Sequence, residues 1–233
     1  MDGGIKVSKG VTFYFMRHAQ TYFNHYGRIQ GWSNAPLTPL GIEQAKASGR
    51  GIADIKFDAV YCSDLQRTQE TLALVLDQNK YKDYYQVQLM KELREVHFGS
   101  FEGQPANVMY DAVDEHLIAG GIDPLTMEKP LEMPKFLKLV KHLDPDHLAE
   151  NYVEFWRRIE SGLLVLLNKH AGTDQKILVM SHGMAIGNLI HGLVADYEGG
   201  QPLQNCSLSI VEYRDGQFRL TACNQIDHFI YDK

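Results

Sequence analysis

Residues 13–21 read FYFMRHAQT, an apolar segment that runs directly into Arg17 and His18. Its aromatic residues predict a buried strand. An isolated arginine–histidine pair after such a strand most often belongs to a surface loop. Here a second segment repeats the pattern, because the apolar run KILVM at 176–180 continues into Ser-His-Gly at 181–183. The chain therefore predicts two buried strands that both end in basic side chains.

Predicted helices alternate with strands along the chain. The first helix is well marked, because Thr38 is a favourable N-cap and Pro39 suits the first helical position. Further strand-like runs lie at 57–63 and 85–93, and helical patterns at 64–78, 152–170 and 182–194. The run SLSIVEYRDGQFRLTAC predicts a closing hairpin that turns at Asp215-Gly216. This alternation predicts an α/β fold, a three-layer α/β/α sandwich with a mostly parallel central sheet and antiparallel hairpin strands at one edge.

We expect a single domain over 1–233, with a helical cap inserted at about 104–150. Within this insertion the pattern loosens, and four prolines at 124, 130, 134 and 145 exclude one long helix. The run KHLDPDHL at 141–148 resembles a metal-binding cluster in composition. Its Asp-Pro-Asp core is typical of turns, which is the interpretation we favour.

Composition narrows the classes of function. The 233 residues are 44% hydrophobic and 22% charged, with a net charge of −6 that disfavours nucleic-acid binding. No stretch approaches the roughly 18 uncharged apolar residues of a membrane span, and the first residues lack the apolar region of a secretory signal. The three cysteines have no C-x-x-C spacing, so we expect buried, reduced thiols in a cytoplasmic protein.

The basic residues are predicted to meet at one edge of the sheet. In an open α/β sheet, ligands bind outside the carboxyl ends of the strands, where Arg17, His18 and His182 fall. Arg67 lies in the first turn of a predicted helix and can point to the same edge. Gly183 would let a ligand approach the backbone and the positive end of the helix that follows it. Two arginines and two histidines predict an anionic ligand, and phosphate fits guanidinium groups best.

Six segments, in order, resemble the histidine phosphatase superfamily in its phosphoglycerate-mutase-like branch. The segments are spread over nearly the whole chain. They read MRHAQTYFN, RIQGWSNAPLTPLGIEQA, SDLQRTQET, LREVHFGSFEG, VMSHGMAI and NCSLSIVEY. Two positions depart from the family signature, since Ala19 replaces a glycine and Gln20 a glutamate. We therefore expect no positive φ at position 19.

The resemblance implies a role for each site residue. His18 would be the nucleophile that carries the phosphoryl group, and Glu95 the general acid and then base. The expected phosphate ligands are Arg17, Asn24, Arg67 and His182, and the expected pocket-lining residues are Gln30, Gly31 and Gly183. The two arginines, together with His182 if it is protonated, would keep the pKa of His18 low, and burial or substrate charge must raise the pKa of Glu95. The resemblance implies no metal and no cofactor.

Four functions stay open. The first is a phosphatase acting on a small phosphorylated metabolite, which the segment HFGSFEG favours. The second is a phosphoglycerate mutase, which moves phosphate between hydroxyl groups. The third is a protein phosphatase, and the fourth a non-catalytic protein that binds a phosphorylated ligand. No nucleic acid or membrane is expected as a partner, and the oligomeric state stays open, a homodimer included.

Overall fold

The structure, a computed structural model, describes residues 9–197, 199 and 202–232. The strands are β1 Val11–Arg17, β2 Ala59–Ser63, β3 Val87–Met90, β4 Gln175–Ser181, β5 Leu208–Arg214 and β6 Gln217–Gln225. The α-helices are α1 Tyr22–His25, α2 Pro39–Gly51, α3 Gln66–Asp77, α4 Ala106–Ala119, α5 Met133–Leu143, α6 Tyr152–His170 and α7 Gly183–Leu193. Short 3₁₀ helices are η1 Lys82–Tyr84, η2 Lys91–Leu93, η3 Gly99–Phe101 and η4 Pro124–Thr126.

The strands form one sheet in the order β3-β2-β4-β1-β5-β6. Strands β3, β2, β4 and β1 run parallel, while β5 and β6 are antiparallel and lie at one edge, as predicted. In the register of β1 against β4, Arg17 pairs with Ser181. His18 and His182 therefore leave two neighbouring strands at the same level, which is why both reach one site.

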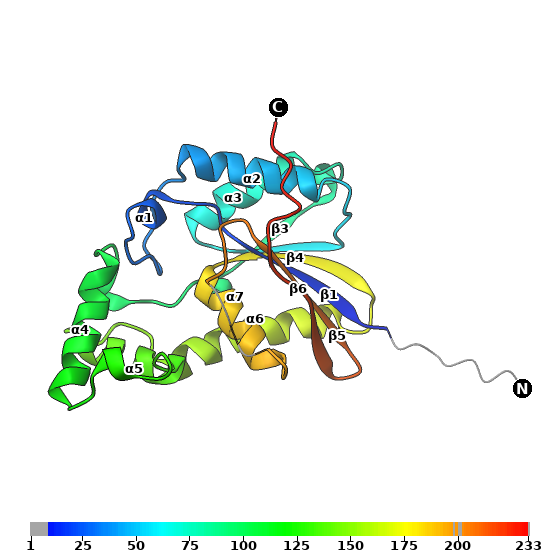
Figure 1. Cartoon of the computed structure of the whole chain (residues 1–233). Coiled ribbons are helices and arrows are strands. Elements are labelled where there is room, and N and C mark those ends of the chain that lie inside the picture. Colours follow the sequence, from blue (N-terminus) through cyan, green and yellow to red (C-terminus); the bar gives the residue numbers. More distant parts are fainter. Residues whose placement is uncertain (1–8, 198, 200–201, 233) are drawn as a thin grey trace, which may run out of the picture.

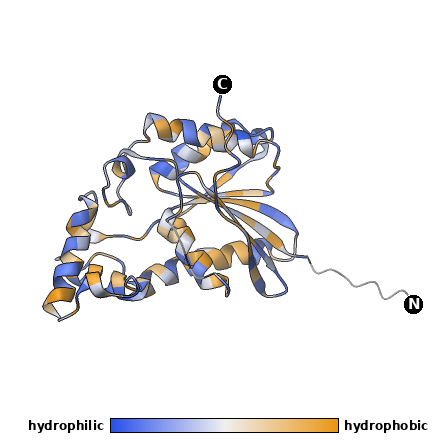
Figure 2. Ribbon diagram, viewed as in Figure 1, coloured by the Kyte–Doolittle hydropathy of each residue, from blue (hydrophilic) through white to orange (hydrophobic). Residues whose placement is uncertain are grey.

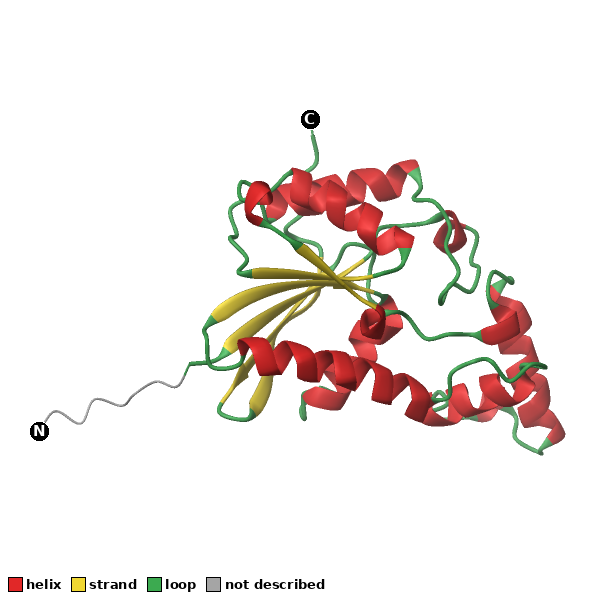
Figure 3. Cartoon of the chain, turned by 180° about the vertical axis from the view of Figure 1, so that it is seen from behind, coloured by secondary structure: helices red, strands yellow, loops and turns green. Residues whose placement is uncertain are grey.

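Helices cover both faces of the sheet, which confirms the predicted sandwich. Figure 1 shows α2 and α3 on one face and α6 and α7 on the other, and Figure 3 shows the same layers from behind. Side chains alternate across the strands, so Phe13 and Phe15 join the core under α6 and α7, whereas Met16 joins the core under α2 and α3. The central strands and the inner helix faces are the hydrophobic parts of the ribbon in Figure 2.

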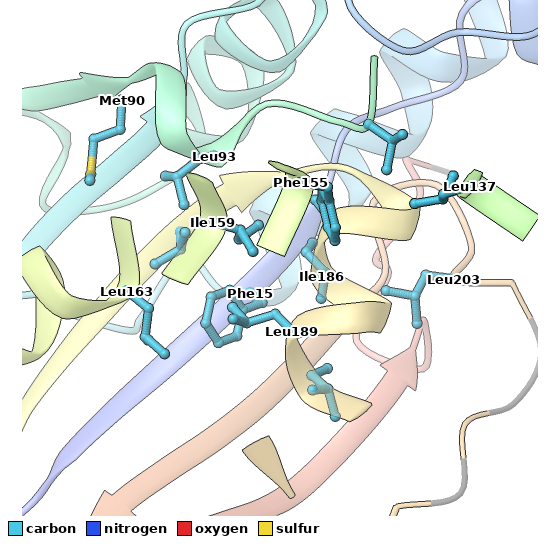
Figure 4. Close-up of a cluster of buried hydrophobic side chains, with 14 of the residues drawn as sticks. Phe15, Met90, Leu93, Leu137, Phe155, Ile159, Leu163, Ile186, Leu189 and Leu203 are labelled. Carbon is cyan, nitrogen blue, oxygen red and sulfur yellow. The ribbon is translucent and has the colours of Figure 1, made fainter. Parts of the chain in front are cut away.

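The larger core is centred on α6. Its apolar stripe points Phe155, Ile159 and Leu163 at the sheet and at Ile186 and Leu189 of α7, as Figure 4 shows. A capping box fixes the start of this helix, because the Asn151 side chain accepts from the backbone of the first turn and Glu154 accepts from the backbone of Asn151. The predicted start of α2 is also confirmed, since Thr38 caps the helix and accepts from the N–H of Gly41.

The proline-rich segment holds α4 and α5 in place of one long helix, and both lie beyond the end of the sheet in Figure 1. Within the run at 141–148, the Asp144 carboxylate accepts hydrogen bonds from the N–H groups of Ser100, Leu148 and Ala149. Asp144 therefore ties the end of α5 to the loop around η3. Among the described residues, no group of three or more His, Cys, Asp or Glu side chains could hold a metal ion.

All three cysteines are free. Cys62 and Cys206 are buried as predicted, and burial raises the pKa of Cys62 to about 12. The prediction of burial was wrong for Cys223, which lies on the edge strand β6 and is partly exposed. Across the part of the chain that the structure describes, no helix is long and apolar enough to cross a membrane.

Candidate active site

His18 lies directly after β1 and is 3% exposed. Its Nδ1 atom lies 2.8 Å from the carbonyl oxygen of Ala19. A carbonyl can only accept, so Nδ1 carries the proton and Nε2 keeps its lone pair. Burial, and then the charges of Arg67 and Arg17, hold the pKa of His18 well below its usual range. The imidazole is therefore neutral, with one nitrogen free to attack an electrophile. Ala19 has no positive φ, as predicted.

His182 faces His18, with ring centroids 5.3 Å apart in an edge-to-face arrangement. Its Nδ1 atom lies 2.9 Å from Nη2 of Arg67, and its Nε2 atom lies 2.9 Å from Oγ of Ser63. A guanidinium only donates, so Nδ1 accepts and Nε2–H donates to Ser63. Burial and the charge of Arg67 hold the pKa of His182 well below its usual range. His182 is therefore neutral in the ligand-free site and adds no positive charge beside His18.

Arg67 is fully buried at the start of α3. Its guanidinium donates to the carbonyl oxygens of Ser33 and Gly31 at 2.9 and 2.7 Å, in addition to His182. Burial lowers the pKa of Arg67 to about 10, so the side chain stays charged at neutral pH. Its Nε atom has no partner among the described residues. A buried donor without an acceptor is costly, and an anionic ligand in the site would satisfy it.

Arg17 ends β1 and is also buried, except for the part that faces a cavity. Its Nη1 atom donates to the carbonyl oxygen of Leu203, and its Nε atom has no partner among the described residues. The loop that holds Leu203 also donates to the backbone of this strand end, through Cys206 to Arg17 and through Asn205 to His18. Two guanidinium groups with buried, unpartnered Nε atoms therefore flank the two histidines.

Glu95 caps the N-terminus of α7. Its two oxygens accept from the N–H groups of Met184 and Ala185 at 2.9 Å each, and one oxygen also accepts from Val96. We expected this positive end of the helix to face a ligand, but a carboxylate of the chain occupies it. Burial raises the pKa of Glu95 above its ordinary value, against the opposite effect of these N–H groups and of Arg67 and Arg17. Burial therefore raises the pKa of Glu95, and it is one of the two causes that we expected from the sequence, the other being the charge of the substrate.

The glycine at 183 serves close packing. A Cβ atom on Gly183 would lie 3.2 Å from Nε of Arg17, so any side chain here would press on the guanidinium. Gly183 lines the same cavity as Arg17 and Glu95. In this structure the group that approaches the Gly183 backbone closely is the Arg17 side chain.

Asn24 and Gln30 both hydrogen-bond to Thr21, and neither lines the cavity beside Arg17. The Asn24 Oδ1 atom accepts from the backbone N–H of Thr21 at 3.1 Å and from Nδ2 of Asn205 at 3.4 Å. Because its oxygen accepts from two donors, the Asn24 amide is oriented by the protein. Gln30 accepts from the hydroxyl of Thr21 at 2.6 Å, and its own Nε2 is buried without a partner among the described residues. Asn205, for which the sequence gave no role, links Asn24 to the His18 carbonyl.

Gly31 lies in a tightly fixed turn outside the cavity lining. Its carbonyl accepts from Arg67, and its N–H donates to the Glu102 carboxylate at 3.1 Å. A Cβ atom would lie 2.1 Å from the carbonyl oxygen of Val96. Glu102 also accepts from the backbone of Trp32 and Ser33. Glu102 was not identified from the sequence. Its carboxylate fixes the turn that contains Gly31 and Ser33, and the carbonyl oxygens of these two residues accept from Arg67.

Arg158 was also missed, although it supports Glu95. It lies on α6, and its Nη2 atom donates to the backbone carbonyl of Glu95 at 2.9 Å and to Glu150 at 2.7 Å. Nε1 of Trp32 donates to the same Glu95 carbonyl at 2.8 Å. The arginine is 63 residues away from Glu95 in the sequence, and no local signal reveals such a contact.

A cavity of about 880 Å³ opens from Arg17, Glu95 and Gly183. It extends between α7 and α5, with Tyr152 of α6 and the segment before β5 as further walls. The site thus combines two neutral buried histidines, the buried Arg67, the half-buried Arg17 and a carboxyl group with a raised pKa, all at the carboxyl end of the parallel strands. This arrangement suits binding and attack on a phosphoryl group.

Comparison with known proteins agrees with this geometry. Residues 13–226 match the histidine phosphatase superfamily (branch 1), and the chain belongs to that superfamily. A Yersinia pestis protein described as a probable phosphoglycerate mutase, GpmB, is 32% identical over 207 residues, which cover 87% of this chain and 85% of the relative.

Solved structures show the same fold. A phosphoglycerate mutase from Bacillus anthracis superposes with a TM-score of 0.85 at 32% identity, covering 95% of this chain and 96% of that one. Bacillus stearothermophilus YhfR superposes with a TM-score of 0.71 at 22% identity, covering 94% and 98%. The chain is therefore a member of a superfamily that handles phosphoryl groups.

Proposed function

We propose that this protein is a metal-independent phosphomonoesterase that hydrolyses a small phosphorylated metabolite through a phosphohistidine at His18. The observation that carries the proposal is the hydrogen bond from Nδ1 of His18 to the carbonyl of Ala19, which leaves Nε2 as the free lone pair. The depressed pKa of His18 supports the same role, because only a neutral imidazole is a nucleophile.

In the first step, Nε2 of His18 attacks phosphorus, and the bond between phosphorus and the ester oxygen breaks. Glu95 donates its proton to the departing oxygen, which leaves as an alcohol. Arg17 and Arg67 stabilise the charge on the phosphoryl oxygens, and each has an unpartnered Nε atom to offer. Asn24 donates from its Nδ2 atom, since its oxygen is already occupied.

In the second step, water attacks the phosphohistidine, and the Glu95 carboxylate takes the proton of that water. The bond between phosphorus and nitrogen breaks, and its electron pair returns to Nε2 of His18. His182 lies beside the reacting group, and both of its ring nitrogens are engaged, by Arg67 and by Ser63. A contact from His182 to the phosphoryl group would therefore replace one of these two hydrogen bonds. The arginines supply the positive charge that a metal brings to other phosphoryl-transfer sites.

A phosphoglycerate mutase is the second candidate, favoured by the two relatives at 32% identity that carry this description. The two activities share the phosphohistidine and differ in its fate. A phosphatase passes the phosphoryl group to water, whereas a mutase passes it to a second hydroxyl group and must exclude water.

One experiment separates these functions. Purified protein is given 3-phosphoglycerate primed with 2,3-bisphosphoglycerate, and separately a panel of phosphomonoesters, with EDTA present throughout. Phosphate release that is lost in His18→Ala supports the phosphatase. Isomerisation without phosphate release supports the mutase instead. Binding of phosphoesters without turnover would contradict both and indicate a binding protein.

We further propose a cytoplasmic location, which the three unpaired cysteines support.

A further inference from the structure

The cavity beside Arg17 is large compared with a three-carbon sugar acid. Its volume of about 880 Å³ lies in the upper part of the roughly 300–1,000 Å³ range of sites that enclose drug-sized ligands. The phosphoryl group can occupy only the end at Arg17, Glu95 and Gly183. The rest of the cavity is therefore available to the leaving group.

The remaining wall is mainly apolar. It includes the side chains of Met133 and Pro134 on α5, Tyr152 on α6, Met184 on α7, and Tyr197 and Leu203 before β5. Aromatic and thioether side chains pack well against flat apolar groups. This wall favours an aromatic or otherwise bulky apolar leaving group.

The charged side chains of the cavity wall also favour an apolar leaving group. Beyond the phosphoryl end, the charged side chains among the described residues that line the cavity are Lys129 and Glu132, and both are exposed to solvent. They offset each other, and no arginine other than Arg17 lines the cavity among the described residues. Asn188 and His191 of α7 add two polar side chains to this wall. The carboxylate of a phosphoglycerate would have no buried cation to pair with in this part of the cavity. An uncharged leaving group needs no such cation, so the lack of one does not weaken its binding.

We infer that the preferred substrate is a monoester of a bulky, largely apolar and uncharged alcohol, held in the recess between α5 and α7. This inference rests on the proposed phosphoryl chemistry and deepens it. It assigns the phosphate to the Arg17 end and the apolar group to the recess lined by Met133, Tyr152, Met184 and Tyr197.

Gly187 on α7 provides a direct test. It lines the cavity, and a Cβ atom there would meet nothing within 4 Å, so the side chain of Gly187→Leu has room at its base and would extend into the recess. Three esters are compared. Phenyl phosphate and 1-naphthyl phosphate have leaving groups of similar acidity and different size, and 3-phosphoglycerate represents a charged leaving group.

The wild-type protein should prefer 1-naphthyl over phenyl phosphate by about tenfold in kcat/KM, from the extra apolar area buried, and should disfavour 3-phosphoglycerate further. Gly187→Leu should lower turnover of the naphthyl ester by on the order of a hundredfold and that of the phenyl ester by less than about threefold. Equal loss on both esters, or a preference for 3-phosphoglycerate, would overturn the inference.

Binding separates this inference from the proposed function. Equilibrium dissociation constants are measured for 1-naphthylphosphonate and methylphosphonate, which cannot be hydrolysed as esters. Tighter binding of the naphthyl compound that Gly187→Leu abolishes supports the recess even if no ester is turned over. Equal binding of the two phosphonates overturns the recess even if the protein proves to be a phosphatase.

Discussion

Nη2 of Arg67 lies 2.9 Å from Nδ1 of His182, so the buried guanidinium donates to the buried imidazole. The pair can form only while His182 is neutral, since a second proton on the ring would face a fixed positive charge. This contact links the catalytic geometry to the protonation state of the site, and it makes the site sensitive to acid.

Acid should destabilise the fold through His18 and His182. The pKa of each is lowered in the folded protein, mainly by burial, while the unfolded chain titrates near 6.5. Below pH 6.5 the unfolded state binds more protons, so stability falls as the pH falls, by about 1.4 kcal/mol per pH unit for each histidine. The raised pKa of Glu95 acts in the opposite direction just above pH 4.5 and lessens the slope there. Urea denaturation at pH 7, 6 and 5 measures this, and a constant free energy of unfolding would contradict it.

Glu95→Gln should separate acid catalysis from binding. The comparison uses kcat/KM, which reports formation of the phosphoenzyme and excludes the later step in which Glu95 acts as base. An alkyl leaving group needs a proton, so kcat/KM for an alkyl phosphate should fall by about 10²–10⁴. The nitrophenolate of p-nitrophenyl phosphate leaves without one, so that substrate should lose far less. The variant keeps the side-chain size but places an NH₂ group against the N–H of Met184 or Ala185, which costs about 1–3 kcal/mol of stability. Equal losses on the two substrates would show that Glu95 is not the acid.

Arg158 positions Glu95 through its backbone, and its test uses the same substrate pair. Arg158→Lys keeps the charge but loses the planar fork that reaches the carbonyls of Glu95 and Arg94. We expect about a tenfold loss in kcat for the alkyl ester and a smaller loss for p-nitrophenyl phosphate. The matched control is Arg157→Lys, because Arg157 is exposed and makes no side-chain hydrogen bond to the described residues. A uniform loss on both esters would indicate a purely structural role.

Two glycines of α7 should respond oppositely to alanine. A Cβ on Gly187 meets open space, so Gly187→Ala should stabilise the protein by about 0.5–1 kcal/mol through helix propensity. A Cβ on Gly192 would lie 2.2 Å from the Trp156 ring, so Gly192→Ala should cost about 1–3 kcal/mol. Thermal unfolding of both variants against wild type measures the difference. Stabilisation by both would mean that Trp156 moves freely away from α7.

The sequence predicted those parts of the molecule that depend on local patterns. Thr38 and Pro39 marked the start of α2, and the turn at Asp215-Gly216, where both residues have positive φ, marked the hairpin. The positions of Arg17, His18 and His182 followed from a general rule, since all three stand at or just beyond the carboxyl ends of parallel strands.

Local sequence patterns could not predict contacts between segments that lie far apart in the chain. Glu95 reaches the N-terminus of α7 across 89 residues, and a carboxylate in a loop carries no sign of that partner. Glu102 and Arg158 were missed for the same reason, because each binds backbone groups more than 60 residues away. The neutral state of His182 also follows only from geometry, through its contacts with Arg67 and Ser63.

The proposed phosphohistidine is tested most directly by trapping it. The protein is mixed rapidly with a ³²P-labelled phosphomonoester, quenched in alkali, and digested for tandem mass spectrometry, while ³¹P NMR identifies the nitrogen that carries the phosphate. We expect phosphate on Nε2 of His18, formed at least as fast as turnover and absent from His18→Ala. Turnover without a phosphoenzyme, or phosphate on His182 in place of His18, would contradict the mechanism.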